Sequence, residues 1–495
     1  MRHAHAALFA ALVPVVPLVL WAGCGDGAGS ARADRPNVIL ISIDSLRADH
    51  LGCYGYARPT SPSIDRLAAE GALFEHVMSS TSWTLPAHAA MFTGLPDSVH
   101  GCDRNTRILA PARATLAERF QGSGYRTAGF WSGPYLHPRF GLAQGFDEYT
   151  SCTGYEVYSA SDIRPDTGTA PERPKGQERA DHLSHGDVTS GLVLERVERW
   201  LRARERAPFF LFVHLWDVHY DYIPPPPYDS MFDPEYQGPR DGRDLVSVAR
   251  SDEPLPARDL EHVIALYDGE IAWTDRHVGR LLDLLDELGL AQGTVVALTA
   301  DHGEEFYEHG RFGHRKALFD ESVRVPLVIR YPRAVPAGVR VAGLASVVDI
   351  APTLLELARV AGLGDVLGES LVGRLGASGA HGDAERAVVS ELFRPWEDDY
   401  LLALRTARWM TIAEPASGER LGLWDLERDP GEREDVLASE GELAAASGRV
   451  LRAELERLAA LVRRHPLAAE LSQGLPRELE EHLRSLGYLG ENGGD

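Results

Sequence analysis

The sequence predicts an α/β protein with a large, mostly parallel sheet flanked by helices and a small C-terminal α+β subdomain. Three observations support this fold class. Four short runs are apolar on both faces, amphipathic helical stretches lie between them, and the pattern changes after about residue 375. The 495 residues are enough for a large core and a second, smaller domain.

The four apolar runs predict buried parallel strands because they are short and rich in β-branched residues. They are NVILISI (37–43), PFFLFVH (208–214), TVVALTA (294–300) and VPLVIRY (325–331). The longest amphipathic stretch between them, residues 259–289, predicts a helix.

The C-terminal part predicts antiparallel strands at 400–414 and 420–426, followed by a charged helix at 437–464. No internal repeat is visible. We therefore expect three parts after the N-terminal segment: a catalytic domain at 36–375, a subdomain at 376–465 and a tail at 466–495.

Two polar insertions interrupt the α/β pattern at 155–187 and 220–258. Both are predicted to be long surface loops, and loops of this length often frame a substrate entrance. The identity of the substrate would then depend on loop conformations that the sequence does not reveal.

The N-terminal residues 1–24 have a basic start, an apolar stretch and small residues before a cysteine, which predicts a secretory signal. The segment LWAGC resembles a bacterial lipobox with Cys24 as the lipidated residue, although Trp21 stands where leucine is usual. We expect an exported protein, either periplasmic or anchored to the membrane as a lipoprotein. Ordinary signal cleavage is the alternative to lipidation.

Net charge, apolar run length and cysteine count limit the possible partners, membrane spans and disulfides. Lys and Arg number 50 against 73 Asp and Glu, a net charge of −23, which argues against nucleic acid or an anionic membrane surface as partner. No internal run reaches the 18 apolar residues of a membrane span. Three cysteines would remain after export, an odd number that allows at most one disulfide among Cys53, Cys102 and Cys152.

Candidate metal ligands follow two of the predicted strands directly. Asp44 follows 37–43, and Asp301 and His302 follow 294–300. In open α/β sheets ligands bind at the carboxyl edge, where these side chains should meet. Oxygen and imidazole donors suit a divalent metal. The alternative is a turn aspartate and an ordinary loop, but the two strand ends together favour a metal site.

The segment SSTSWTLPAHAAMFTG (79–94) predicts a helix N-terminus at Thr84, because Pro86 suits the first turn. Free backbone N–H groups stabilise an anion at such a place. A threonine hydroxyl coordinated to a cation can attack phosphorus or sulfur. In the alternative, Thr84 is only an N-cap.

Six segments between about residues 36 and 435 carry a family resemblance: RPNVILISIDSLRADHLGCYGY, TLPAHAAMFTG, GFDEY, ALTADHGEEFYEHGRFGH, ESVRVPLVIRYP and LWDLERDPGERED. Together, and in this order, they resemble the sulfatase family of the alkaline phosphatase superfamily. The resemblance implies hydrolysis of sulfate or phosphate-type esters at a sheet edge. It also implies one divalent metal ion, and oxygen-rich ligation puts calcium, magnesium or manganese ahead of zinc.

The resemblance also implies roles for individual residues. Metal ligands would be Asp44, Thr84, Asp301 and His302, with Thr84 also the nucleophile. His219 would contact substrate or protonate the leaving group, and His314 is a second candidate for that proton transfer. Lys316 would lie near the transferred group, and His88 would either face the substrate or only cover its helix.

Three departures from the family pattern bear on the mechanism. The motif C/S-x-P-x-R reads Thr84-Leu85-Pro86-Ala87-His88 here. Threonine cannot yield formylglycine because its β-carbon carries a methyl group, and His88 replaces the arginine. Ser45 follows Asp44 where the family usually has a second acid. We therefore expect direct attack by Thr84 on a small-molecule or glycan ester.

Two other functions stay open: a phosphoethanolamine transferase-like enzyme, and a non-catalytic binding protein for sulfated or phosphorylated glycans. The sequence predicts no oligomeric state. Near the site, Arg47 is expected either to pair with Asp49 or to contact substrate. Glu304, Glu305 and His309 are close enough in sequence to support the metal ligands.

Overall fold

The computed structural model describes residues 35–153, 189–251, 253–376, 386–394, 399–439 and 441–465, together with 469, 470, 475, 479, 480 and 483. The predicted signal segment, the insertion at 155–187 and most of the predicted tail lie outside the described residues. Residues Pro36–Asp495 form one unit, separate from Met1–Arg35. All of the following concerns the larger unit.

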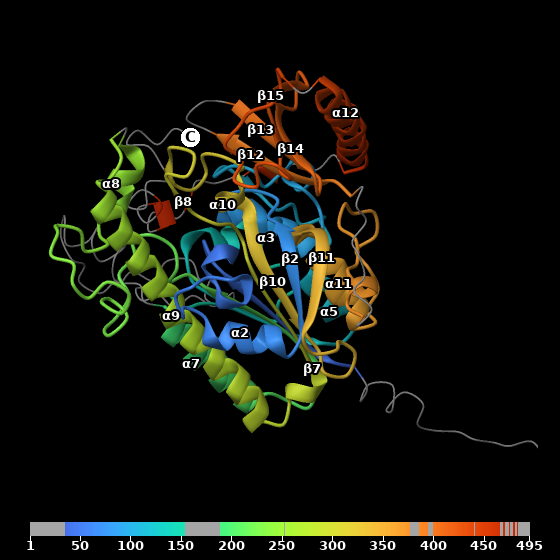
Figure 1. Cartoon of the computed structure of the whole chain (residues 1–495). Helices are drawn as coiled ribbons and strands as arrows, with labels where there is room; N and C mark the ends of the chain where they lie inside the picture. Colours follow the sequence, from blue (N-terminus) through green and yellow to red (C-terminus); the bar gives the residue numbers. More distant parts are fainter. Residues whose placement is uncertain are drawn as a thin grey trace, which may run out of the picture. The chain divides into compact units, whose positions relative to one another are not determined.

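The core of the molecule is an eight-stranded sheet in the order β11-β2-β10-β7-β1-β6-β4-β5 (Figure 1). Seven strands run parallel, and only β10 runs antiparallel to its neighbours β2 and β7. The bounds are β1 Asn37–Ile43, β2 Ala72–Met78, β4 Arg126–Trp131, β5 Glu148–Ser151, β6 Phe209–Leu215, β7 Thr294–Ala300, β10 Arg324–Arg330 and β11 Val339–Ser346.

The four predicted strands are confirmed as β1, β6, β7 and β10, but the expected parallel direction of β10 is wrong. The connection from β7 to β10 contains a two-stranded ribbon, β8 Glu305–Phe306 with β9 Phe312–Gly313, and the four-residue helix α10 Asp320–Val323. It has no crossover helix that would return the chain to the opposite edge. The chain therefore re-enters the sheet from the edge where β7 ends.

Helices cover both faces of the sheet. The predicted long helix is α9, Ala257–Glu287, which packs on α2, Pro62–Ala69, and α7, Ser190–Ala203. A second group consists of α3, α5 and α11, which contact one another. Figure 1 shows the two groups on opposite sides of the strands. The remaining bounds are α3 Thr84–Thr93, α4 Asp97–His100, α5 Leu116–Gly122, α8 Leu245–Arg250 and α11 Ile350–Leu357.

The C-terminal part forms an antiparallel sheet in the order β12-β13-β14-β15, which confirms the predicted antiparallel strands and adds β12, which was not predicted. Its strands are Val388–Arg394, Asp399–Arg405, Trp409–Glu414 and Glu419–Asp425. Helix α12, Gly441–Arg464, packs on it through a second hydrophobic core. That core joins the sheet residues Leu402 and Leu404 to Leu451 of α12 and to Leu95 and Val99 from the loop and helix after α3.

The small sheet is also bonded to the loop that precedes α3. Ser390 Oγ of β12 donates to the carbonyl of Ser79 at 2.6 Å. The next residue, Glu391, donates its backbone N–H to the carbonyl of Ser80, also at 2.6 Å. The C-terminal sheet therefore helps to fix the segment that leads into Thr84.

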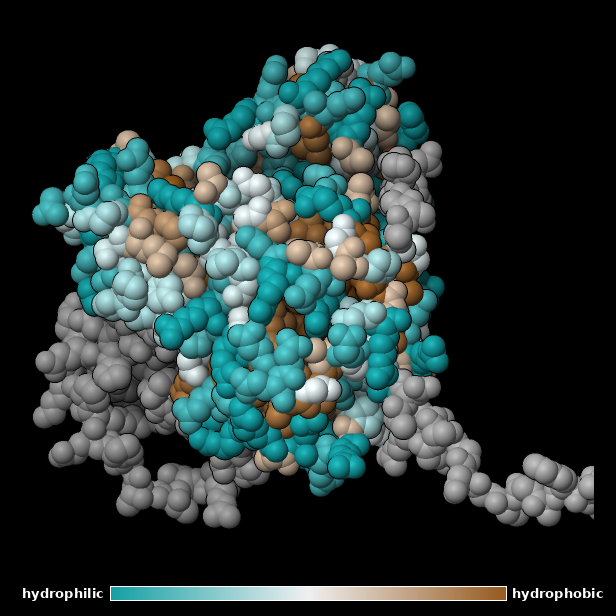
Figure 2. Space-filling view, turned by 60° about the horizontal axis from the view of Figure 1, so that its bottom comes forward, coloured by the Kyte–Doolittle hydropathy of each residue, from teal (hydrophilic) through white to brown (hydrophobic). Residues whose placement is uncertain are grey.

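The surface view in Figure 2 is mostly hydrophilic, with hydrophobic residues in small separate patches. Large apolar side chains that are exposed within the described residues are Met231, Leu421 and Val462. No helix in that part of the chain has both the length and the hydropathy needed to cross a membrane. The three cysteines Cys53, Cys102 and Cys152 are free thiols.

Candidate active site and metal centre

Two carboxylates meet at the carboxyl edge of the large sheet. Strands β1 and β7 pair with Ile43 opposite Ala300, so Asp44 and Asp301 leave the sheet side by side. Both are fully buried. Ser45 lies between them in the left-handed region, with φ 54°; its N–H donates to Asp301 Oδ1 at 3.2 Å and its hydroxyl donates to Asp44 Oδ1 at 3.1 Å.

His302 lies beside these two carboxylates, and a backbone contact holds a proton on its Nδ1. Its Nδ1 lies 2.8 Å from the carbonyl oxygen of Gly303, which can only accept a hydrogen bond. Nδ1 therefore carries a proton, and Nε2 presents a lone pair when the ring is neutral, as metal binding requires. Nε2 lies 3.5 Å from Asp44 Oδ1 and 3.6 Å from Asp301 Oδ2.

Thr84 is the first residue of α3, and its side chain points at this group. The N-cap of the helix is Trp83, and no side-chain capping bond is present. Thr84 Oγ1 lies 3.3 Å from Asp44 Oδ2 and 3.4 Å from His302 Nε2. The interpretation of Thr84 as an N-cap is therefore wrong.

The four side chains fit a bound cation. Burial raises the pKa of Asp44 and of Asp301, and for Asp301 the neighbouring Asp44 raises it further. Burial alone would lower the pKa of His302, but Asp301 and Asp44 outweigh it and raise it. Within the described residues Asp301 Oδ2 has no hydrogen-bond partner. A divalent metal would satisfy this oxygen and balance the two carboxylates.

His219 and His314 lie beside His302. The ring centroids of His219 and His314 are 5.0 Å apart, and those of His302 and His314 are 4.6 Å apart. Nδ1 of His219 donates to the carbonyl of Tyr220 at 2.5 Å. Burial lowers the pKa of His219 to about 3 and lowers that of His314 well below its usual value. Both imidazoles are therefore neutral at neutral pH.

Glu304 supports His314 from behind, as expected of a residue near the metal ligands. Its Oε1 lies 3.0 Å from His314 Nδ1, and Tyr222 donates to its Oε2 at 2.9 Å. Burial raises the pKa of Glu304 to about 8. Arg47 pairs with Asp49, with Nε 2.9 Å from Oδ1.

The other two residues expected behind the ligands bond elsewhere. Glu305 accepts from Ser322 Oγ at 3.0 Å, and His309 Nδ1 lies 2.6 Å from Glu321 Oε1. These contacts hold the segment after β7 against α10 and its flanks.

His88 and Lys316, the predicted substrate ligands, direct their polar atoms elsewhere. His88 is fully buried; its Nδ1 lies 2.8 Å from the carbonyl of Thr84 and its Nε2 accepts from Ser42 Oγ at 3.0 Å. Burial lowers the pKa of His88 to about 3. Lys316 Nζ donates to the carbonyls of Phe312, at 2.8 Å, and Ala249. Their role in substrate binding stays a prediction.

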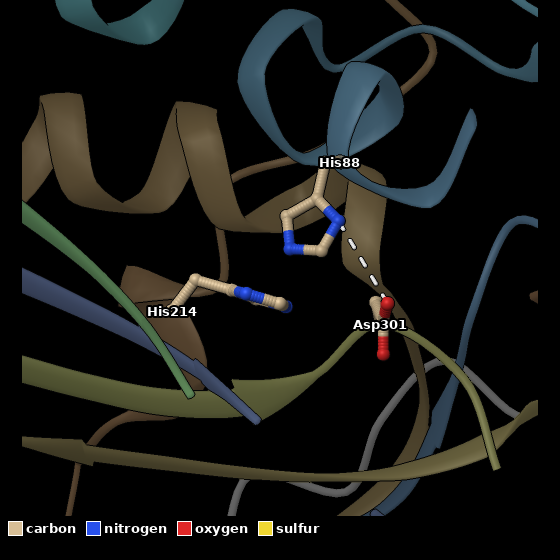
Figure 3. Close-up of side chains that lie close together, drawn as sticks. All are labelled: His88, His214 and Asp301. Atoms are coloured by element: carbon tan, nitrogen blue, oxygen red, sulfur yellow. Dashed lines mark ion pairs between the residues drawn. The ribbon is translucent and has the colours of Figure 1, made fainter. Parts of the chain in front are cut away.

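His214 reaches the same group, although the sequence did not single it out. It lies on β6 opposite Ser42 of β1, and Figure 3 shows its ring close to His88 and Asp301. Nε2 of His214 lies 3.5 Å from Asp44 Oδ2. Burial lowers the pKa of His214 to about 4. The available signal was one polar residue in the apolar run PFFLFVHL.

Arg315 is a second buried residue near Thr84 that no sequence motif indicated. It is buried between His314 and Lys316, with φ 64°, and its N–H donates to the carbonyl of Ser82 at 3.1 Å. Its guanidinium lies 4.0 Å from the centroid of the Trp83 ring. The loop before Thr84 is thus flanked by a buried cation.

Comparison with known proteins agrees with this architecture. The sulfatase family model matches residues 36–360, and the model of the N-sulphoglucosamine sulphohydrolase C-terminal region matches 307–460. An ulvan-active sulfatase of Formosa agariphila is 26% identical over 414 residues, which cover 81% of this chain and 77% of the relative. The chain spans about three fifths (61%) of the length of the mouse and human iduronate 2-sulfatases that it also matches.

Two solved structures have the same fold. A protein in complex with its substrate D-glucosamine-2-N,6-O-disulfate gives a TM-score of 0.69 at 20% identity, covering 87% of this chain and 98% of that one. The phosphonate monoester hydrolase of Agrobacterium radiobacter gives 0.68 at 25% identity, with 90% and 99% covered. With the family model matched over most of the described sheet, the chain belongs to the sulfatase family and is an ester hydrolase of that family.

Proposed function

We propose that the protein is a metal-dependent hydrolase of sulfate or phosphate-type esters in which Thr84 itself is the nucleophile. The observation that carries the proposal is the position of Thr84 Oγ1, 3.3 Å from Asp44 Oδ2 and 3.4 Å from His302 Nε2, with no capping bond. The residues that would hold the metal are Asp44, Thr84, Asp301 and His302. When bound, a divalent cation favours loss of the hydroxyl proton and neutralises charge on the transferred group.

The first chemical step joins the Thr84 oxygen to sulfur or phosphorus and breaks the bond to the leaving oxygen. The threonine proton passes to water, and the leaving oxygen departs as an alkoxide or takes up a proton from water. The product is a sulfo- or phospho-threonine. The N-terminus of α3, at which Thr84 lies, would contribute positive charge toward the negative charge that develops on the non-bridging oxygens.

The second step is attack of water on the covalent intermediate, which restores the Thr84 hydroxyl and releases sulfate or phosphate. His219 and His314 are neutral at neutral pH because burial lowers their pKa values. Such a low pKa also makes each ring a weak base, so either would deprotonate this water only if the negative charge of the bound intermediate raises its pKa. Protonation of the leaving group, the role first expected for them, requires that substrate binding raise their pKa.

The substrate class proposed is a sulfated or phosphorylated glycan or small-molecule ester. The support is indirect: the similar proteins include an ulvan-active sulfatase, a protein bound to its substrate D-glucosamine-2-N,6-O-disulfate, and a phosphonate monoester hydrolase. The direct threonine mechanism applies to sulfuryl and phosphoryl esters alike. We further propose that the chain is exported, on the signal-like residues 1–24.

A matched series of p-nitrophenyl esters tests the function: sulfate, phosphate monoester, phosphodiester and phosphonate, each with metal-loaded protein. We expect turnover of at least one ester, and loss of that turnover on chelation or in Thr84→Ala. The preferred ester then decides between sulfuryl and phosphoryl chemistry. Activity retained by Thr84→Ala would overturn the mechanism.

The same assay separates the alternatives. Turnover that rises with an added alcohol acceptor, with transfer of the group to it, would indicate a transferase. Absence of turnover together with saturable binding of a sulfated glycan would indicate a binding protein.

A further inference from the structure

Nε2 of His214 is a buried nitrogen without a hydrogen bond. The ring is fully buried, and its Nδ1 lies 2.8 Å from the carbonyl oxygen of Ser132. Because a carbonyl oxygen only accepts, Nδ1 carries the proton and Nε2 presents a lone pair. None of the described residues hydrogen-bonds this Nε2.

The lone pair of His214 faces other acceptors. Nε2 lies 3.5 Å from Asp44 Oδ2. Asp301, whose Oδ2 is also unsatisfied within the described residues, belongs to two groups of potential metal ligands: one with His214 and His88, and one with Asp44 and His302. Acceptors that face one another in a buried site are unfavourable unless a cation lies between them. A cation bound here would therefore pair with the His214 nitrogen as well as with the carboxylates.

His214 repeats the arrangement of His302, a predicted metal ligand. In both rings Nδ1 is tied to a backbone carbonyl at 2.8 Å, and Nε2 faces Asp44 at 3.5 Å. This outer hydrogen bond is typical of histidines that bind metals, because it fixes the tautomer and the ring orientation.

His88, the third residue drawn in Figure 3, differs from these two histidines. Both of its ring nitrogens already have partners, the carbonyl of Thr84 and the hydroxyl of Ser42. It is 3.8 Å from Asp301 Oδ2, beyond hydrogen-bond distance. His88 therefore anchors the first turn of α3, whereas His214 and Asp301 keep open donor atoms.

We propose that His214 Nε2 is a fifth ligand of the metal, an inference that rests on the metal site of the proposed function. The donor set then contains two imidazoles, from His214 and His302, two carboxylates and the Thr84 hydroxyl. Imidazole nitrogen favours zinc and other first-row transition metals, whereas calcium and magnesium prefer oxygen alone. The site accordingly selects a transition metal such as zinc, against the order expected from the sequence.

The test is metal affinity, measured without substrate. Protein freed of metal by chelation is titrated with Zn²⁺ and with Ca²⁺ in competition with a chromophoric chelator. The variant is His214→Asn, because the asparagine amide keeps a donor for the carbonyl of Ser132 and lacks Nε2. His76→Asn is the control, since His76 is exposed on β2.

We expect one ion per chain, with zinc bound more tightly than calcium. His214→Asn should weaken zinc binding by more than the roughly 10- to 100-fold that loss of an outer-shell partner costs and calcium binding by much less, and His76→Asn should change neither. Unchanged zinc affinity in folded His214→Asn, or wild-type preference for calcium, would overturn the inference.

A second measurement covers the case in which His214→Asn does not fold. Pulsed electron paramagnetic resonance of wild-type protein loaded with Cu²⁺ counts the coordinated imidazoles. Two imidazoles support the proposal, and a single one contradicts it. Failure of wild type to bind any of these metals would instead overturn the metal site of the proposed function.

Discussion

At the scale of the residue, Thr84 differs from an ordinary helix-start threonine in what its oxygen faces. Oγ1 lies against a buried carboxylate and an imidazole nitrogen rather than a backbone N–H. Thr84→Ser keeps this oxygen, so we expect activity within about tenfold of wild type. Thr84→Val keeps the shape without the oxygen and should lose at least about a thousandfold. Steady-state kinetics with matched thermal midpoints checks both, and an active Thr84→Val would contradict the role.

Asp301 is expected to be needed for metal binding and activity but to lower the stability of the metal-free protein. Asparagine at this position keeps an acceptor for the N–H groups of Ser45 and His302 and replaces Oδ2 by an amide donor. Without metal, Asp301→Asn should therefore be more stable than wild type by about 1–3 kcal/mol, while its activity and metal affinity fall. Denaturant unfolding in the presence of chelator measures this. If metal-free Asp301→Asn is less stable than metal-free wild type, the two carboxylates do not need a cation to balance their negative charge.

The sequence was informative where chemistry follows directly after a strand. Asp44, Asp301 and His302 come together because parallel strands end at one edge. His214 was missed because it lies within a strand, where an apolar run predicts core and the side-chain partners come from β1 and the loop after β4. Long-range partners of this kind are not encoded in local pattern.

At the scale of the element, composition predicted which segments are strands but not all of their directions. β10 is as apolar as β1 or β7. An apolar composition predicts that a strand is buried on both faces but does not predict its direction. Its direction depends on the connection after β7, which stays at the carboxyl edge to form the ribbon around His314. The helix α9 was predicted closely because its apolar stripe repeats over many turns.

Strand β12 carries a pH-sensitive group. Burial, with Asp97 adding to it, raises the pKa of Glu391 from 4.5 to about 8. The folded state thus keeps a proton that the unfolded state releases above pH 4.5. Its contribution to stability is complete below that pH and is lost as pH rises to about 8.

Glu391→Gln removes this titration and keeps the acceptor for the N–H of Ser98. Between pH 5 and 8, wild type should lose stability relative to the variant by about 1.4 kcal/mol per pH unit. Urea unfolding at several pH values measures the difference. Parallel stability profiles would show that Glu391 ionises in the folded protein as it does in the unfolded chain.

At the scale of the whole molecule, the two sheets should unfold together. They share the second hydrophobic core and the bonds from β12 to the loop before α3. Leu402→Ala, deep in the small sheet, should cost about 2–5 kcal/mol and lower the midpoints of activity and of near-ultraviolet circular dichroism equally. A circular dichroism transition that precedes loss of activity would show that the small sheet is dispensable.

The bonds from β12 to that loop can form only late in synthesis of the chain. Ser79 and its partner Ser390 are 311 residues apart. At about 5–20 residues per second, the ribosome adds the second roughly 15–60 s after the first. During that interval the loop that leads into Thr84 is without these two bonds, so even a nascent chain that has reached His314, the last of the proposed catalytic residues, still lacks this support.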